Sequence, residues 1–556
     1  MVSNKRSTRG IRPFRRYPAL AFLGAAAALA ILLPSALNVP QSGPTTLAEF
    51  APVPGAGDGR SDISDLGSAQ SGGLGFGTGR GGASRKAPEA SAPKQSRPTL
   101  KRCVGSPPRQ TEDPLSPPCV AFFDGDNFGA TTKGVTRGEV TVVLFTNNGP
   151  AGQFVDCALA PNAQDTAIDV GCKAYMRYFN ERYQTYGRKV HMWQFYTSGT
   201  TTNQATTAAI DMDSKKNPFA EVGDGRNFTD GLNRENARRK VLTTVLPGVL
   251  RKSQQDFAPF LITFKPDYDD QSSIVASYIC LKLAGRPARY AGPGTNQTDP
   301  RRFAFYAADK GFQDRLDAQL QNQCDLKVTI SEDLTVSTAV PATQMRAAGA
   351  TTAIVFGSGN LTLATANANQ AGWFPEWLIA GSNFTYSTDS SIAARNFEPT
   401  QWSRAFGVSF DYRRKGVVEQ PWYQAYREAC PSCPEPDREA SAVYDSLAML
   451  FYGIQAAGPR LSPESLDKGM HAIPPNGSST PYKPAAYFSP GNFSYIKDGM
   501  EIWWDASAQA PGETVLGCYR LTNGGQRFRL GEWLSGDHNL KQPDSPCQGS
   551  TAVGPR

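Results

Sequence analysis

The sequence predicts an α/β protein with two doubly wound lobes, each built on a parallel sheet, after a long non-globular N-terminal region. Strand-like and helix-like segments alternate from about residue 134 onward, which is typical of parallel sheets covered by helices. The alternation occurs in two series, at 138–284 and at 301–382. Hydrophobic residues make up 40% of the 556 residues, enough to bury sizeable cores without a stabilising metal or cofactor.

The first series begins with a strand, a helix and a second strand. Residues 138–146 (GEVTVVLFT) are a β-branched run of strand length. Within 163–187 apolar side chains recur at helical spacing, and Gly187 stands where a C-terminal cap is expected. Residues 189–196 (KVHMWQFY) then alternate as a strand. This order predicts a right-handed crossover between parallel strands.

The remaining elements follow by the same patterns. The rest of the first series predicts helices at 201–214 and 272–284 and strands at 218–223 and 259–264. The second series predicts strands at 301–307, 326–334, 352–358 and 376–382 and helices at 311–322 and 339–348. Residues 441–458 form a strongly amphipathic pattern and predict one more helix.

The N-terminus has the composition of a membrane-targeting segment. Residues 1–16 carry six cations and no acidic residue, and 17–39 contain no charge. A 23-residue apolar helix can span about 30 Å of hydrocarbon, and the cations would stay cytoplasmic. We therefore expect a cell-membrane protein with a single N-terminal pass and the folded part extracytoplasmic. Secretion after cleavage of a signal peptide is the alternative.

Residues 40–133 are rich in Gly, Ser, Pro and Ala, a composition that favours a disordered stalk. The net charge of +7 comes from the N-terminus. Without the six cations of residues 1–16 and the excess of four in 41–110, residues 111–556 sit near −3. A slightly acidic folded region argues against nucleic-acid binding, which depends on clustered cations.

The ten cysteines are an even number, which in an exported chain indicates disulfides. The simplest connectivity is sequential, although the sequence alone cannot establish it: Cys103 with Cys119, Cys157 with Cys172, Cys280 with Cys324, Cys430 with Cys433, and Cys518 with Cys547. The CPSC motif at 430–433 could also serve redox chemistry or bind zinc. With no second CxxC and no nearby His, a small structural loop is the better interpretation.

An ordered series of segments resembles a known family. The segments GVTRGEVTVV, GCKAYMRYFNERYQTYGRKVHMW, RRFAFYAADKGF, QMRAAGATTAIVFGSGN, NQAGWFPEWLIAGS and YDSLAMLFYGIQAAGPRLSPESLDKGM cover roughly 134–495. Together they resemble the type I periplasmic-binding-protein fold, in particular the leucine/isoleucine/valine-binding receptors of ABC transporters. The resemblance implies two lobes joined by crossing strands at a hinge, with a small polar ligand in the cleft between them.

The resemblance also implies a division into domains. The expected parts are a basic tail at 1–16, a membrane segment at 17–39, a stalk at 40–133, lobe 1 at 134–300 with a return segment at about 436–480, and lobe 2 at 301–435 with a C-terminal segment at about 481–548. An ABC permease as partner is implied by the resemblance alone. No cofactor, metal or catalytic residue is expected.

Open α/β sheets bind ligands beyond the carboxyl ends of their strands, so polar loop residues after strands are the candidates for the ligand site. They are Asn147, Asn148, Asp224, Arg226 and Asn227 in the first lobe and Asp309, Lys310, Ser358, Asn360, Ser382 and Asn383 in the second. Each could also be an ordinary turn or cap residue. The first-lobe loop GDGRN lacks the neighbouring Ser or Thr that would receive an amino-acid carboxylate, so the ligand stays open.

Two further groups of charged residues need an interpretation. Arg226, Arg234, Arg238 and Arg239 could face an anion, but a solvated basic helix face is the preferred reading. Asp124, Asp126, Asp267, Asp269 and Asp270 could act as a carboxylate pair, and DGDN at 124–127 is an incomplete calcium-type loop, but turn residues are the simpler assignment.

The sequence thus predicts an extracytoplasmic solute-binding protein. It contains no GxSxG, no GxxxxGK[ST] and no HExxH motif, so three common catalytic signatures are missing. Two alternatives remain: a cell-envelope protein-interaction module that has lost solute binding, and a carboxylate-dependent hydrolase.

Overall fold

The computed structural model describes most of the chain after residue 102. The described residues are 103–146, 151–161, 165, 167–197, 201–223, 230–245, 248–308, 310–328, 330–331, 339–356, 361–381, 391–436 and 439–550. The expected membrane segment at 17–39 lies outside them. Among the helices of the described part, none is long and apolar enough to cross a bilayer.

The first sheet is parallel except at one edge. Its strands are β3 (Glu139–Thr146), β4 (Phe154–Asp156), β5 (Lys189–Tyr196), β6 (Ala220–Gly223), β7 (Leu242–Val245) and β8 (Leu261–Thr263). They are ordered β4-β5-β3-β6-β7-β8, with β4 antiparallel to β5 and all other pairs parallel. The helices of this part are α2 (Ala167–Arg182), α3 (Thr202–Lys216), α4 (Asp230–Arg238), α5 (Arg251–Phe257), α14 (Glu439–Ala457) and α15 (Pro463–Ala472).

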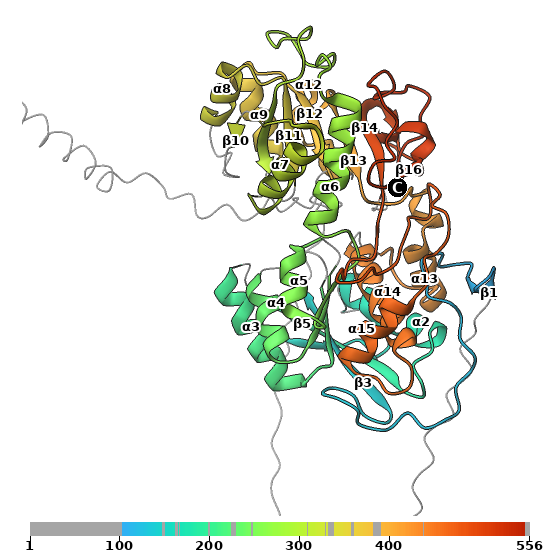
Figure 1. The fold of residues 1–556 in the computed structure, drawn as a ribbon. Coiled ribbons are helices and arrows are strands. Elements are labelled where there is room, and N and C mark those ends of the chain that lie inside the picture. Colours follow the sequence, from blue (N-terminus) through green and yellow to red (C-terminus); the bar gives the residue numbers. More distant parts are fainter. Residues whose placement is uncertain are drawn as a thin grey trace, which may run out of the picture. The chain divides into compact units, whose positions relative to one another are not determined.

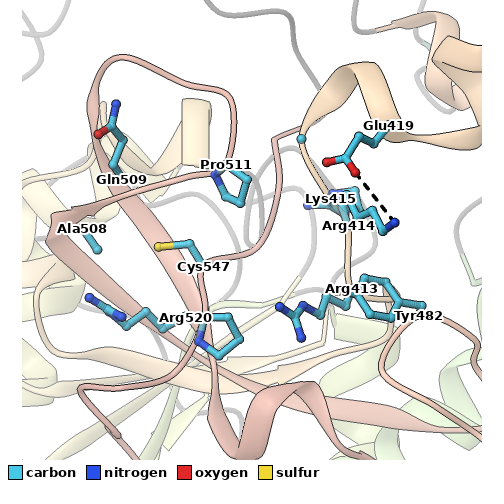
Figure 2. A pocket seen from close by; sticks show the side chains of 12 residues that line it. Arg413, Arg414, Lys415, Glu419, Tyr482, Ala508, Gln509, Pro511, Arg520 and Cys547 are labelled. Atoms are coloured by element: carbon cyan, nitrogen blue, oxygen red, sulfur yellow. Dashed lines mark ion pairs between the residues drawn. The ribbon is translucent and has the colours of Figure 1, made fainter.

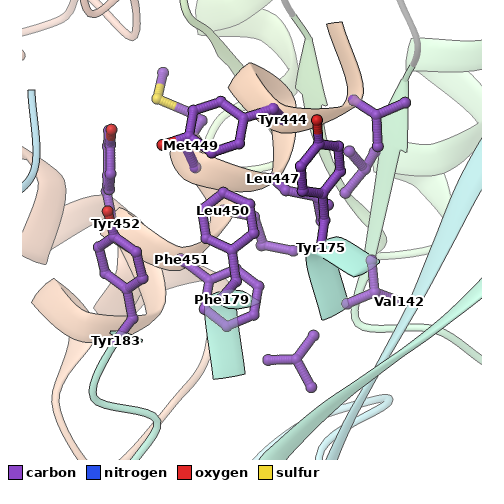
Figure 3. Packing of buried hydrophobic residues seen from close by; sticks show 14 of the residues in the cluster. Val142, Tyr175, Phe179, Tyr183, Tyr444, Leu447, Met449, Leu450, Phe451 and Tyr452 are labelled. Atoms are coloured by element: carbon purple, nitrogen blue, oxygen red, sulfur yellow. The ribbon is translucent and has the colours of Figure 1, made fainter. Parts of the chain in front are cut away.

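Successive side chains of β3 belong to two different cores, one on each face of the first sheet. Val142 and Leu144 share a core with α2 and α14, whereas Val143 and Phe145 share one with α3 and α4. Successive side chains of a strand point to opposite faces, so one strand serves both cores. The α14 core is rich in aromatic residues, and Tyr183 of the turn after α2 lies against Tyr452 of α14 (Figure 3). The expected amphipathic helix at 441–458 is thus present and returns to the first sheet (Figure 1).

The second sheet is parallel in its first half and antiparallel in its second. Its strands are β9 (Phe303–Ala308), β10 (Ile330–Ser331), β11 (Thr352–Phe356), β12 (Glu376–Ala380), β13 (Ala405–Ser409), β14 (Gly499–Gln509), β15 (Leu516–Leu521) and β16 (Arg527–Phe528). The order is β10-β9-β11-β12-β13-β14-β15, with β16 paired to β14. From β10 to β13 all pairs are parallel, and β14, β15 and β16 run antiparallel. The C-terminal strands therefore complete a sheet begun by residues 303–409 (Figure 1).

Helices of the second part pack on both faces of this sheet. They are α6 (Tyr268–Tyr278) continued by the π-helix η2 (Ile279–Leu283), α7 (Lys310–Cys324), α8 (Val340–Ala347), α9 (Leu361–Gln370), α11 (Ser391–Ala394) and α12 (Pro399–Trp402). Three other short elements are η3 (Val417–Glu419), α13 (Pro421–Ala429) and η4 (Thr522–Gly525), and β1 (Cys103–Val104) pairs with β2 (Arg109–Gln110) near the N-terminus. The predicted α/β class with mostly parallel sheets is confirmed. The full set of domain boundaries stays a prediction.

Some elements differ from the expectation for identifiable reasons. The helix α2 ends at Arg182, five residues before Gly187, which lies in the following turn at φ 80° and caps no helix. Strand β7 went unpredicted because its four residues follow a strongly basic stretch. Strand β13 went unpredicted because Gly407 interrupts its apolar run. A Cβ at Gly407 would lie 2.1 Å from the carbonyl oxygen of Ile379, so the close approach of β12 requires glycine there.

The structured part begins earlier than the predicted end of the stalk at residue 133. The carboxyl group of Asp113 is buried and accepts hydrogen bonds from the hydroxyls of Tyr183 and Tyr452 and the N–H of Leu115. Tyr495 donates to the carbonyl of Leu115 at 2.7 Å. Composition alone suggested disorder, but these contacts anchor residues 109–118 to the first part of the fold. Residues 109–118, which we call the N-terminal segment, are thus packed as part of the fold.

All ten cysteines form the five sequential disulfides that were expected. The CPSC motif closes a loop of only three residues between α13 and α14, as a structural loop does. The bond Cys157–Cys172 instead links the turn after β4 to the buried face of α2.

Replacing both Cys157 and Cys172 with alanine should lower the free energy of unfolding by about 3 kcal/mol, because the bond closes 15 residues and restricts the unfolded chain. Urea unfolding curves would measure the loss. The matched control is the Cys430/Cys433 double alanine variant, whose three-residue loop should cost clearly less. An equal loss in both variants would contradict the loop-closure account.

Candidate functional site

The polar segments after the strands are where the ligand site was predicted. Strands β3, β6, β9, β11 and β12 end at Thr146, Gly223, Ala308, Phe356 and Ala380. Each therefore ends within two residues of a predicted site residue, at the carboxyl edge of its sheet. Ten of the eleven predicted residues lie outside the described residues: Asn147, Asn148, Asp224, Arg226, Asn227, Asp309, Ser358, Asn360, Ser382 and Asn383.

Lys310 is the one predicted site residue that the structure describes. It begins α7, its side chain is 63% exposed, and its ammonium group pairs with Asp314 one helical turn later. Such an i,i+4 pair on an exposed helix is an ordinary surface contact. The site as a whole therefore stays a prediction.

Several of the other charged candidates have structural partners. On α4, Arg238 and Arg239 both pair with Glu235, and Arg239 also pairs with Asp213. The guanidinium groups of Arg238 and Arg239 lower the pKa of Glu235 to about 2, because their effect exceeds the opposing effect of burial. In the DGDN stretch, Asp126 accepts a hydrogen bond from the N–H of Phe128, as a turn residue does. In the described part of the chain, no cluster of three or more His, Cys, Asp or Glu residues could hold a metal ion.

Three chain segments cross between the two sheets, at 263–268, 409–415 and 492–499. They leave β8, leave β13 and enter β14, respectively. The first and third are joined like strands: the N–H of Tyr495 donates to the carbonyl of Thr263 at 3.0 Å and that of Ile496 to Phe264 at 3.0 Å. The first and second are joined by the ion pair of Lys265 and Asp411 at 2.7 Å. We call these three segments the crossing segments.

A charged network ties the start of α6 to the crossing segments. Asp267 caps α6 and binds Arg251 of α5 at 2.9 Å, and Asp270 contacts both Arg251 and Lys497. Burial and the neighbouring Asp270 raise the pKa of Asp267. Burial alone would also raise the pKa of Asp270, but Lys497 and Arg251 lower it. Two of the suspected catalytic carboxylates are thus fully occupied by cations and by a helix cap.

Two cavities lie beside the second crossing segment. The first, of about 550 Å³, is lined by Arg413, Lys415, Glu419, Tyr482 and Arg520 among others (Figure 2). Its cations have partners: Lys415 lies 3.7 Å from Glu419, Arg520 binds Asp505 at 2.6 Å, and the Arg413 guanidinium lies 4.9 Å above the ring of Tyr482. These charged groups therefore already contact neighbouring groups of the protein.

The second cavity, which we call the hinge cavity, has a volume of about 410 Å³. It lies between the N-terminal segment, the start of α14 and the second crossing segment. Its walls are aromatic, with Phe264, Tyr412, Tyr444 and Tyr452, and the carboxyl group of Asp445 stands among them. The burial of Asp445 raises its pKa to about 8, with the charge of Asp411 adding to the effect.

The residues of the hinge cavity were not among the sequence candidates. The signal that could have found them is Asp445 itself, the one charged residue in the 17-residue stretch 441–457. A carboxylate within an apolar helix must be paired, neutral or functional. Asp113 carried no such signal, because the composition around it predicted disorder.

Similarity to known proteins identifies the family to which the chain belongs. No curated protein matches the chain. Among solved structures, a solute-binding protein of an ABC transporter from R. palustris with 4-hydroxybenzoate is 10% identical, covering 71% of this chain and 98% of that one, with a TM-score of 0.48. The branched-chain amino acid transporter substrate binding protein LivJ from Streptococcus pneumoniae, in complex with isoleucine, is 12% identical, covering 66% and 96%, with a TM-score of 0.46. The leucine-, isoleucine-, valine-, threonine- and alanine-binding protein from Brucella ovis is 10% identical, covering 75% and 99%, with a TM-score of 0.48.

The family profile described as periplasmic binding protein matches residues 160–493, more than half of the chain. The matched region runs from just before α2 to the third crossing segment. It therefore includes β5 to β8 of the first sheet, β9 to β13 of the second, the first two crossing segments and the start of the third. The chain belongs to the periplasmic binding protein family.

Proposed function

We propose that this chain is an extracytoplasmic solute-binding protein that closes two lobes around a small polar ligand, an amino acid or a related compound. The observation that carries the proposal is the pairing of two mostly parallel sheets through three crossing segments. Such sheets bind ligands at the carboxyl ends of their strands, and crossing segments allow the lobes to close as hinged bodies.

The site of this proposal consists of the polar residues that follow the strands. Asparagine, aspartate and serine side chains offer hydrogen-bond donors and acceptors for a zwitterionic or amide ligand. Asn147 and Asn360 would approach the ligand from opposite lobes. No covalent chemistry is needed for this function.

The location and partner follow from the same proposal. Five disulfides favour an oxidising compartment, so the folded part would be extracytoplasmic. Residues 17–39 would anchor the chain in the cell membrane by a single pass, or would be removed as a signal. An ABC permease would be the partner that receives the solute.

The test is the melting temperature of the full-length protein with branched-chain and other amino acids, short peptides, amides, sugars and aromatic acids. A ligand of the folded state stabilises it by about 2.7 kcal/mol at a hundredfold excess over Kd, so a saturable rise in Tm is expected with one chemical class. No rise with any class would overturn the proposal and favour a protein-interaction module.

A variant pair locates the site once a ligand is found. Asn147→Ala combined with Asn360→Ala should weaken binding by at least tenfold, measured by calorimetry, because each removes a hydrogen-bonding side chain from one lobe. The control is Asn203→Ala on the exposed face of α3, which should leave Kd unchanged. Unchanged binding in the double variant would place the solute site elsewhere.

A further inference from the structure

The hinge cavity contains polar groups for which the described protein supplies no partner. Asp445 makes no hydrogen bond and no ion pair with any described residue, although it is partly buried. The hydroxyl of Tyr444 is buried, with 4% of the residue exposed, and it too finds no hydrogen-bond partner in the described part of the fold. Buried polar groups are normally hydrogen-bonded, so the unsatisfied hydroxyl of Tyr444 beside the half-buried acid Asp445 points to a ligand in this cavity.

The other charged groups around the cavity are already engaged. Asp113 is saturated by two tyrosine hydroxyls and a backbone N–H. Arg414 donates to Asp411 at 2.7 Å and to the carbonyl of Gly549 at 2.8 Å. Lys415 lies 3.7 Å from Glu419. Arg413 lies over the ring of Tyr482, 4.9 Å from its centroid, and donates to the carbonyl of Gly524 at 3.4 Å. Among the described residues of the lining, Asp445 and the hydroxyl of Tyr444 are therefore groups that a ligand could meet.

The lining also provides the apolar part of a binding site. Phe264 enters from the first crossing segment, Tyr412 from the second, and Tyr444 and Tyr452 from α14. Aromatic faces attract cations through their quadrupole, and a carboxylate binds an ammonium group by charge-assisted hydrogen bonds. An acid within an aromatic cavity is thus the chemistry that recognises an organic cation.

We propose that the hinge cavity binds a small organic ammonium compound, with Asp445 as the carboxylate that holds its charged nitrogen. The hydroxyl of Tyr444 accepts a hydrogen bond from the same ammonium group or from a polar substituent of the ligand. The volume of about 410 Å³ limits the ligand to a small molecule of roughly the size of an aromatic amine.

This site differs from the solute site proposed above. Its lining contains none of the eleven strand-end residues predicted for the solute site, and it is closed on one side by residues 111–115, which precede the family match at 160–493. It contacts two crossing segments and α14, so a bound ligand would touch elements of both sheets. The inference stands whether or not the strand-end residues bind a solute.

The charges facing Asp445 determine how its binding depends on pH. Asp411 and Arg414 face it from the second crossing segment, Lys265 from the first and Asp113 from the N-terminal segment. With a pKa of about 8, Asp445 is mostly protonated at neutral pH and must lose its proton to pair with an ammonium group. Affinity should therefore rise by up to tenfold per pH unit between pH 6 and 8 and then level off.

The test is calorimetric titration of the full-length protein at pH 8 with phenethylamine, phenethyl alcohol and 3-phenylpropionate as matched probes. The expected result is saturable binding of the amine at one site, at least thirtyfold tighter than either other probe. Equal binding of the alcohol would overturn the proposal in favour of a neutral hydrogen-bonding ligand. No binding of the amine at millimolar concentration would overturn it outright.

Variants assign the binding to named groups. Asp445→Asn should weaken phenethylamine binding by at least thirtyfold and abolish its pH dependence, whereas Tyr444→Phe should weaken it three- to tenfold. Asp211→Asn on the surface of α3 is the control and should change neither. Retained affinity in Asp445→Asn, with a normal unfolding transition, would contradict the assignment.

The two proposals fail independently. Asn147→Ala with Asn360→Ala should leave phenethylamine binding intact, and a solute from the Tm panel should raise Tm further when the amine is already bound. If the amine competes with that solute, the hinge cavity and the solute site are one site, and the separate-site inference is wrong.

Discussion

Replacing Arg301 with methionine should lower the free energy of unfolding by about 3–5 kcal/mol. The side chain of Arg301 is fully buried two residues before β9, where its guanidinium binds Glu376 at 2.7 Å and Asp537 at 3.2 Å. Glu376 is also fully buried, so removing the cation leaves carboxylates without compensation in an apolar interior. Equilibrium unfolding in urea at pH 7 measures the effect.

The neighbouring Arg302 provides a matched control. It is exposed, so Arg302→Met should change stability by no more than about 0.5 kcal/mol. Adding Glu376→Gln to Arg301→Met should recover part of the loss, since one of the unpaired charges is then removed. A loss below about 1 kcal/mol in Arg301→Met would mean that water reaches this site and that the pair does not hold the second sheet to its C-terminal segment.

The second prediction is a gain rather than a loss of stability. Asp445→Asn should raise the free energy of unfolding of the ligand-free protein by an amount on the order of 4 kcal/mol at pH 7.5, since each pKa unit corresponds to about 1.4 kcal/mol. The pKa of Asp445 is about 8 in the folded protein and near 4 when unfolded. The folded state therefore binds the proton more tightly, and the acid costs stability progressively as pH rises from 4 to 8.

The pH profile distinguishes this effect from better packing. Wild type and Asp445→Asn should be nearly equal at pH 4 and diverge up to pH 8, as measured by urea unfolding at each pH. Asp211→Asn, whose carboxylate is exposed beside Lys215, should run parallel to the wild type throughout. A difference that stays constant with pH would show that Asp445 is ionised and solvated, and it would remove the electrostatic part of the hinge-cavity argument.

A stability cost at Asp445 fits a residue kept for binding. Aspartate could be replaced by asparagine at nearly constant volume with a gain in stability, yet the chain carries the acid within an apolar helix. Functional sites are often less stable than the fold could make them. Occupation by a cation would recover the cost, which ties the second prediction to the proposed ammonium ligand.

Much of the fold followed from local patterns. The alternation in 189–196 matches β5 residue for residue, and the β-branched run before Asn147 is β3. The sequential cysteine pairing is present in full. These features are encoded by neighbours in the sequence, because side-chain period and short loop closure are local properties.

The less predictable elements depended on distant partners. Gly407 is a residue that normally weakens a strand, but here the backbone of Ile379 lies too close for any larger side chain. The polar composition around Asp113 predicted disorder, but in the structure the hydroxyls of Tyr183 and Tyr452 donate hydrogen bonds to its carboxyl group. In both cases a local preference is overridden by contacts between residues far apart in the chain.

The α/β class, the two series of parallel strands and the polar positions at the strand ends followed from the sequence, whereas the sequential disulfide pairing was only its simplest hypothesis. The partners of the acids became known from the three-dimensional fold: Asp267 and Asp270 bind Arg251 and Lys497, whereas Asp445 faces an aromatic cavity. The reason is physical. The period of a strand or helix depends on residues that are close in the sequence. The charge state and availability of a carboxyl group depend instead on its burial and on partners from other segments of the chain.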